Sequence, residues 1–169
     1  LLVPVIVVLI LFLLSLSNPE YLPAIFTAEN KTSLLMTAII MGLAVGFFEE
    51  LGWTGFVVPR LRQRFGLLAA GLIVGVLWGA WHYPPFSAST ADAGNLHPAF
   101  YLAVLLFSFL PAYRVLLVWI YEQTESLLLV ILMHAPLSAC QLALIPPTLT
   151  GGKIVTYNLI FSATLWVLA

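Results

Sequence analysis

Six long apolar segments, separated by short polar loops, constrain this 169-residue chain more than any other feature of its sequence. A membrane-spanning helix needs about 20 predominantly apolar residues, and the six segments reach or approach that length. Within lipid each backbone polar group needs a partner in its own segment, so we expect helices. A β-barrel would instead show alternating segments of about 10 residues. The sequence therefore predicts an all-α, polytopic transmembrane helix bundle of about six spans. The segments are residues 1–17, 33–58, 67–83, 98–120, 126–146 and 153–169.

The composition supports a multi-pass integral membrane protein whose surroundings are a lipid bilayer. Hydrophobic residues make up 62% of the chain and charged residues only 8%, whereas a soluble domain carries about 25% charged residues. This excludes a soluble enzyme, a nucleic-acid binder and a disordered protein. The single cysteine, Cys140, excludes an internal disulfide and a multi-cysteine zinc site. We expect one transmembrane domain over residues 1–169, with truncated termini, and the sequence indicates no oligomeric state.

Positive charge sets the expected orientation of the bundle. Arg60, Arg62 and Arg64 crowd the loop that follows the second segment, which places that loop in the cytoplasm. The loop at 84–97 has no Lys or Arg and suits the outside, although Lys31 and Lys153 lie on expected outer loops as well.

A few ionisable residues fall within the apolar segments instead of the loops. They are Glu49 and Glu50 in the second segment, His82 in the third and His134 in the fifth. A charge inside the membrane costs at least about 2.5 kcal/mol on insertion scales, so such residues usually mark a functional site. At a rise of about 1.5 Å per residue, Glu50, His134 and Ser138 lie about 15, 13 and 19 Å from the cytoplasmic end. His82 lies deeper, at about 24 Å, so a tilt or late start of its helix would bring all of them to one buried layer, in a cavity between helices.

The local sequence around these residues adds detail. Glu49 and Glu50 point about 100° apart around a helix, so one of them can act on a substrate while the other has a structural role. Gly42 and Gly46 give that helix small surfaces for close packing. Arg114 has two interpretations: it extends to the membrane interface, or it pairs with Glu50.

Pro136 should kink the fifth helix, and Pro84 with Pro85 should end the third helix after His82.

Three stretches together resemble a known family. They are FFEELGWTGFVVPRL at 47–61, GVLWGAWHYP at 75–84 and WIYEQTESLLLVILMHAPLSA at 119–139. They are similar to the CPBP family, the CAAX-processing and bacteriocin-processing intramembrane proteases, also called Abi proteins. The family pattern is EExxxR, then FxxxH, then HxxxN.

The acidic pair of that pattern matches Glu49 and Glu50, and its two histidines match His82 and His134. Order and spacing agree over a core of about 36–140.

Three positions depart from the pattern. Thr54 stands at the arginine, Trp78 at the phenylalanine and Ser138 at the asparagine. An arginine four residues after Glu50 could neutralise it, whereas threonine offers only a hydrogen bond. Serine has one hydroxyl donor where asparagine has an amide with two.

The resemblance implies an endopeptidase that hydrolyses a peptide bond within the membrane. Carried over, Glu49 is the general base that activates water, His82 assists it, and His134 with Ser138 stabilises the oxyanion. Glu50 completes the candidate catalytic set. Hydrolysis needs a base for the water and donors aimed at the developing negative charge.

A zinc mechanism would use the same side chains. Glu49, His82 and His134 are ligand types that can hold Zn²⁺ and leave a position open for water. Because HExxH, the usual helical zinc spacing, is absent, we favour a mechanism with no cofactor and keep zinc as the alternative.

The expected partner is a protein or peptide substrate, either prenylated or carrying a leader. We expect the site to open toward the cytoplasm from the plasma membrane. Two other functions stay open: a non-proteolytic protein of the same fold, such as a scaffold or immunity protein, and a proton-relay or transporter module.

Overall fold

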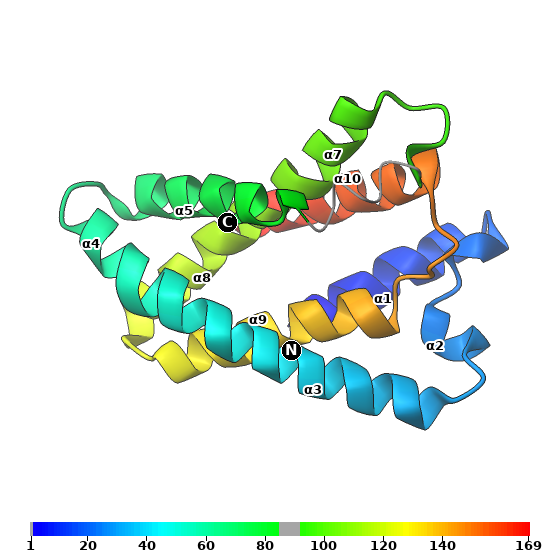
Figure 1. Ribbon diagram of the computed structural model, residues 1–169, viewed down its shortest axis with the longest axis horizontal. Coiled ribbons are helices and arrows are strands. Elements are labelled where there is room, and N and C mark those ends of the chain that lie inside the picture. Colours follow the sequence, from blue (N-terminus) through cyan, green and yellow to red (C-terminus); the bar gives the residue numbers. More distant parts are fainter. Residues whose placement is uncertain (1, 85–91) are drawn as a thin grey trace.

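Figure 1 shows the protein as a computed structural model, which describes residues 2–84 and 92–169. Within those ranges the chain is helical and has no strands, and each of the six expected segments is helical over most of its length. The predicted all-α bundle is therefore confirmed. The α-helices are α1 (Leu2–Ser15), α2 (Ala24–Thr27), α3 (Lys31–Gly52), α4 (Val58–Arg62), α5 (Leu67–Trp81), α7 (Pro98–Phe107), α8 (Leu110–Thr124), α9 (Leu127–Ala143) and α10 (Gly151–Leu168).

Side-chain caps explain where two of the long helices begin. Asn30 accepts a hydrogen bond from the backbone N–H of Ser33 at the start of α3, and Ser126 accepts one from Leu129 at the start of α9. Both residue types are favoured at helix N-termini because their side-chain oxygens satisfy free backbone donors. Pro85 and half of the expected loop at 84–97, residues 85–91, lie outside the described residues.

The second segment bends through a wider turn directly after the glutamate pair. A π-helical turn, η2 (Trp53–Val57), joins α3 to α4, and the backbone N–H of Trp53 donates to the carbonyls of both Glu49 and Glu50. Such turns insert one extra residue into a helix and are frequent at functional sites.

The fourth segment divides into two helices. α7 ends at Phe107 and α8 begins at Leu110, with Pro111 in the first turn of α8. The carbonyl of Ser108 at this break accepts hydrogen bonds from Ser162 Oγ at 2.7 Å and from Trp166 Nε1 at 3.2 Å, both on α10.

Glycines set the closest helix packing. A Cβ atom added to Gly42 would lie 2.5 Å from the carbonyl oxygen of Ala135, and one added to Gly46 would lie 3.1 Å from the Ala135 nitrogen. The predicted small surface of α3 is therefore confirmed, and α9 packs against it. Gly71 and Gly75 of α5 lie against the backbone of α8 in the same way.

Two ion pairs place the loops at opposite ends of the bundle. Arg62 Nη2 lies 2.5 Å from Glu122 Oε1, so the loops after α4 and α8 share one end, which we call the arginine end. Lys153 Nζ, in the first turn of α10, lies 2.5 Å from Glu20 Oε2, which brings the start of α10 and the segment before α3 together at the other end, the lysine end.

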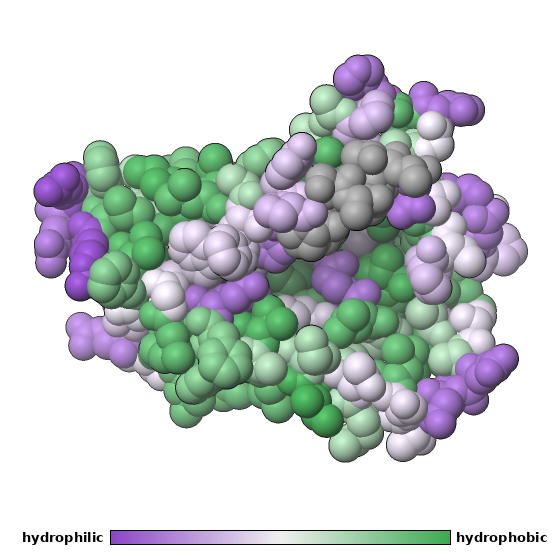
Figure 2. All heavy atoms as spheres, viewed as in Figure 1, coloured by the Kyte–Doolittle hydropathy of each residue, from purple (hydrophilic) through white to green (hydrophobic). Residues whose placement is uncertain are grey.

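The outer surface suits a bilayer. Among the described residues, the helical stretches Lys31–Arg62 and Pro98–Thr124 are long and apolar enough to cross a membrane, and α1, α5 and α9 are apolar but shorter. Figure 2 shows hydrophobic residues over most of the visible face, with hydrophilic ones mainly at the two ends of the long axis and in a central hollow.

Candidate active site

Glu50 is the centre of a buried polar cluster in which three helices meet. Its side chain is 0% exposed. Arg114 Nη1, from α8, lies 2.9 Å from one carboxylate oxygen and 2.8 Å from the other, and His134 Nδ1, from α9, lies 2.6 Å from Oε1. Thr54 Oγ1 donates to Oε2 from the π-helical turn. A buried carboxylate is tolerated when it is paired and hydrogen-bonded, and Glu50 has both kinds of partner.

Glu49 faces α5 instead, as the 100° separation of adjacent helical residues requires. Its Oε2 accepts a hydrogen bond of 2.6 Å from Trp78 Nε1. The carbonyl of Trp78 in turn accepts a bond of 2.8 Å from His82 Nδ1 at the C-terminal end of α5. Because a carbonyl only accepts, His82 carries a proton on Nδ1. Trp78 thus connects Glu49 to His82.

Trp78, the partner of Glu49, also contacts the partners of Glu50. Its ring is buried and lies edge-on to the rings of His82 and His134, with centroids 5.6 and 5.1 Å apart. The guanidinium carbon of Arg114 lies 4.2 Å above the centroid of the same indole, a favourable cation–π distance. The indole therefore contacts both halves of the polar cluster.

A cavity of about 540 Å³ lies beside this cluster. His82, His134 and Ser138 line it, together with Trp78 and, from α10, Asn158. The other lining residues are mainly apolar, so the cavity combines an apolar wall with a few polar groups, as small-molecule and substrate sites do. Further lining residues are Met41, Val45, Leu105, Leu106, Phe109, Leu110, Leu137, Gln141, Leu142, Ile145 and Ile154.

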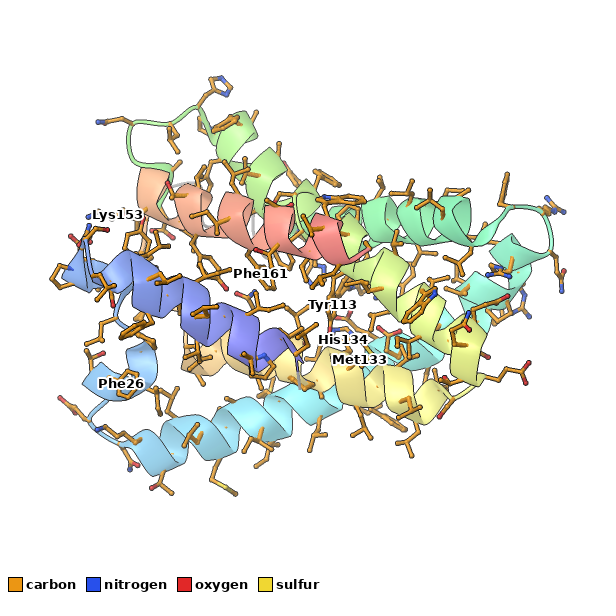
Figure 3. All side chains as sticks on the ribbon, turned by 180° about the vertical axis from the view of Figure 1, so that it is seen from behind. Phe26, Tyr113, Met133, His134, Lys153 and Phe161 are labelled. Atoms are coloured by element: carbon orange, nitrogen blue, oxygen red, sulfur yellow. The ribbon has the colours of Figure 1, made fainter. Side chains whose placement is uncertain are left out.

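The segment of α9 that carries His134 is held by consecutive residues of α8. Tyr113 Oη donates to the carbonyl of Met133 at 2.5 Å, while Arg114 holds His134 through Glu50. In Figure 3 Tyr113, Met133 and His134 lie together near the centre of the bundle, and Lys153 lies at one end. Pro136, inside α9, lacks the N–H that an ordinary residue would donate, so contacts from α8 help to fix this part of the helix.

The structure brings the sequence-predicted residues to one region. Glu50 and His134 are in direct contact, whereas Glu49 and His82 are linked through Trp78. Ser138 lines the cavity one turn after His134.

The structure also decides between the two interpretations of Arg114. The side chain is 0% exposed and pairs with Glu50, so it does not extend to the interface. Tyr113 and Asn158 were not predicted as site residues. Asn158 had a signal in the sequence, since it is an amide side chain within an apolar segment.

The zinc alternative can be compared with the donor geometry. Among the described residues, no three His, Cys, Asp or Glu side chains are arranged to hold one metal ion. Glu49 is directed at Trp78, and His134 uses Nδ1 on Glu50. The set Glu49, His82 and His134 therefore does not form a three-ligand site in this arrangement.

Fold and site together define a class: a helical membrane protein with carboxylate, imidazole and guanidinium groups buried beside a cavity. The chain matches the profile of the Rce1-like type II CAAX prenyl endopeptidase family over residues 31–140 and belongs to that family. A stretch of 42 residues is 40% identical to CAAX prenyl protease 2 of Methanococcus maripaludis, covering 25% of this chain and 16% of that protein. The match thus spans less than a fifth of that relative's length. No solved structure matches the chain.

Proposed function

We propose that the protein is an intramembrane endopeptidase that hydrolyses a peptide bond in a membrane-associated protein or peptide. The observation that carries this proposal is that His82 and His134 line one cavity between helices, with Glu50 bonded to His134 and Glu49 joined to His82 through Trp78, which lines the same cavity. These residues match the acidic pair and the two histidines of the family pattern. A CAAX-type substrate follows from the family, and a leader-bearing peptide is the other class.

In the proposed reaction Glu49 is the general base. Trp78 Nε1 holds its Oε2, and Oε1 accepts no hydrogen bond from the described residues. Oε1 takes a proton from water as the water oxygen bonds to the scissile carbonyl carbon. The same proton then passes to the amide nitrogen of the substrate, the carbon–nitrogen bond breaks, and a carboxylic acid and an amine leave.

His134 and Ser138 stabilise the oxyanion in this scheme. Because the Nδ1 of His134 donates to the Glu50 carboxylate, its Nε2 is the ring atom left for the substrate. In this scheme the ring carries a proton on both nitrogens, so that Nε2 is a donor as well. Ser138, one turn later, offers a hydroxyl donor from the same cavity wall. Two donors that are already in place before the reaction stabilise developing charge more than water does, because they need no reorganisation.

Cleavage of a reporter peptide by the purified protein in liposomes tests this function. Glu49→Gln keeps the size and loses the base, so activity should fall by about 10²–10⁴-fold. Glu122→Gln is the matched control, because that carboxylate pairs with Arg62 at the arginine end, away from the cavity. Equal cleavage by the wild type and Glu49→Gln would sink the proposal and would favour a non-proteolytic protein of the same fold.

We further propose that the reaction needs no metal. Elemental analysis and a chelator titration test this directly: activity should persist at saturating chelator with no stoichiometric zinc. If the wild type holds one zinc atom per chain and His82→Ala loses it, the proposal is wrong and the mechanism depends on a metal.

The position of the cavity bears on which end of the bundle faces the cytoplasm. Its lining runs along α9 from His134 to Leu142, continues to Ile145 just after that helix and includes Ile154 of α10, so it extends toward the lysine end. We propose that the site opens to the cytoplasm from the plasma membrane, which makes the lysine end cytoplasmic. The crowded arginines predict the reverse, so labelling of single cysteines at positions 64 and 153 with an impermeant maleimide decides between the two.

A further inference from the structure

The buried carboxylate of Glu50 contacts His134 and needs a positive charge to balance its own. The helix that carries Glu50 does not supply that charge. Thr54, one turn after Glu50, donates a hydrogen bond but carries no charge. The positive charge comes from α8, where Arg114 Nη1 contacts both oxygens of Glu50. Both side chains are 0% exposed, so water screens the pair little.

The position of Arg114 matters for the imidazole of His134. Glu50 Oε1 lies 2.6 Å from His134 Nδ1 and 2.9 Å from Arg114 Nη1. The carboxylate is therefore a bridge: it is held by the guanidinium on one side and orients the ring on the other. Within the described residues no hydrogen bond fixes the ring at Nε2.

Arg114 also stacks on Trp78, whose Nε1 donates to Glu49. One cation thus contacts the residue that holds Glu49 and the carboxylate that holds His134. Arg114 itself is not among the residues lining the cavity, so it acts on the reaction through these neighbours.

We propose that Arg114 is a positioning residue that orients His134 through Glu50, and that it supplies from α8 the charge that Thr54 cannot supply from its own helix. This inference rests on the proposed function. It accounts for an active site that keeps the glutamate pair and both histidines while lacking the arginine four residues after Glu50. It also removes the missing arginine as a reason to regard the chain as inactive.

The test combines kinetics with a measurement of His134 that does not depend on activity. Arg114→Met removes the charge and keeps an unbranched apolar chain. We expect kcat to fall about 100-fold, as for a displacement of about 1 Å in a catalytic group, with KM within about threefold because Arg114 does not contact the cavity. In ¹⁵N-histidine-labelled protein in micelles, the Nδ1 and Nε2 signals of His134 should shift. The three histidines can be assigned by substitution.

Arg62→Met is the matched control, since Arg62 makes an ion pair with Glu122 at the arginine end. It should leave kcat and the His134 signals unchanged. The double variant Thr54→Arg with Arg114→Met moves the cation to a position one turn after Glu50 in the chain. Its kcat should be at least tenfold higher than that of Arg114→Met alone.

Loss of a buried partner can prevent folding, so Arg114→Lys is made in parallel. It keeps the charge but loses the guanidinium group whose central carbon lies 4.2 Å from the centroid of the Trp78 ring, and we expect an approximately tenfold lower kcat with shifted His134 signals. Wild-type kcat and unchanged His134 signals in either folded variant would overturn the inference. If the wild type itself cleaves no reporter, the proposed function fails, and the His134 signals alone decide the role of Arg114.

Discussion

The contact between α3 and α9 allows a stability prediction to be worked out from one atom. Gly42 faces the backbone of α9, and a Cβ atom there would lie 2.5 Å from Ala135 O and 3.0 Å from Ala139 Cβ. Comfortable carbon contacts begin near 3.5 Å, so in Gly42→Ala the two helices must separate by roughly 1 Å. The obstructing atom is backbone and cannot rotate away.

The magnitude follows from two opposing terms. Overpacking costs about 1–3 kcal/mol, and a rigid backbone contact belongs at the upper end of that range. Replacing glycine by alanine inside a helix returns about 1 kcal/mol. The free energy of unfolding should therefore fall by about 2 kcal/mol, which lowers the unfolding midpoint by roughly 4–8 °C for a chain of this length.

The same displacement should reduce activity, because Ala135 follows His134 in the chain. Moving α9 away from α3 lengthens the 2.6 Å contact between His134 Nδ1 and Glu50, and a misplacement of about 1 Å can cost about 10²-fold in rate. Thermal unfolding in detergent and reporter cleavage measure the two effects. Gly52→Ala on the same helix is the control, since its Cβ meets nothing within 4 Å. Equal midpoints and rates for the two variants would refute the reasoning.

Three further predictions follow from single contacts. Trp78→Phe keeps a buried ring but removes the 2.6 Å hydrogen bond to Glu49, so reporter cleavage should drop at least tenfold. The unfolding midpoint should also fall, because the smaller ring leaves a cavity at a buried site; unchanged cleavage would contradict the role given to the indole. Lys153→Ala breaks an ion pair with Glu20 whose members are 41% and 48% exposed, so the free energy of unfolding should change by less than about 1 kcal/mol; a larger loss in a denaturation series would show that the contact is structural. Cys140 is 6% exposed, so maleimide should label it slowly in the folded protein and rapidly after denaturation, and fast native labelling would indicate looser packing of α9.

The length and continuity of the apolar segments were enough to predict the helices, because each backbone group in lipid must bond within its own segment. They did not predict the break in the fourth segment. Pro111 gives a local signal for it, since its ring clashes with the carbonyl four residues earlier, at Phe107, where α7 ends. The break leaves the Ser108 carbonyl to be bonded by side chains of Ser162 and Trp166, which lie more than fifty positions away. Nothing in the local sequence indicates these donors.

The candidate site could also be predicted only in part from the sequence. The motif residues could be chosen from sequence because a carboxylate or imidazole inside an apolar segment is costly and needs a reason. The partner of Glu50 could not be chosen. An arginine in an apolar segment can avoid an unpaired charge in the membrane in two ways, by reaching the interface or by pairing with a buried carboxylate. Which of the two occurs depends on how α8 is rotated against α5, and the glycines of α5 at Gly71 and Gly75 allow the close approach of α8 that buries Arg114.

This packing explains how Glu49 and Glu50 can be neighbours in the chain. Two carboxylates at one buried point would repel each other, but neighbours on a helix differ by about 100° and meet different helices. Glu50 faces α8 and α9, where Arg114 balances its charge and His134 takes its orientation from it. Glu49 faces α5 and has the neutral donor of Trp78 as its partner, and no cation among residues 2–84 and 92–169 pairs with it. Glu49 is thus held in place by a neutral donor, whereas Glu50 is held by a cation. This difference supports the proposed division of roles, in which Glu49 is the base and Glu50 supports His134.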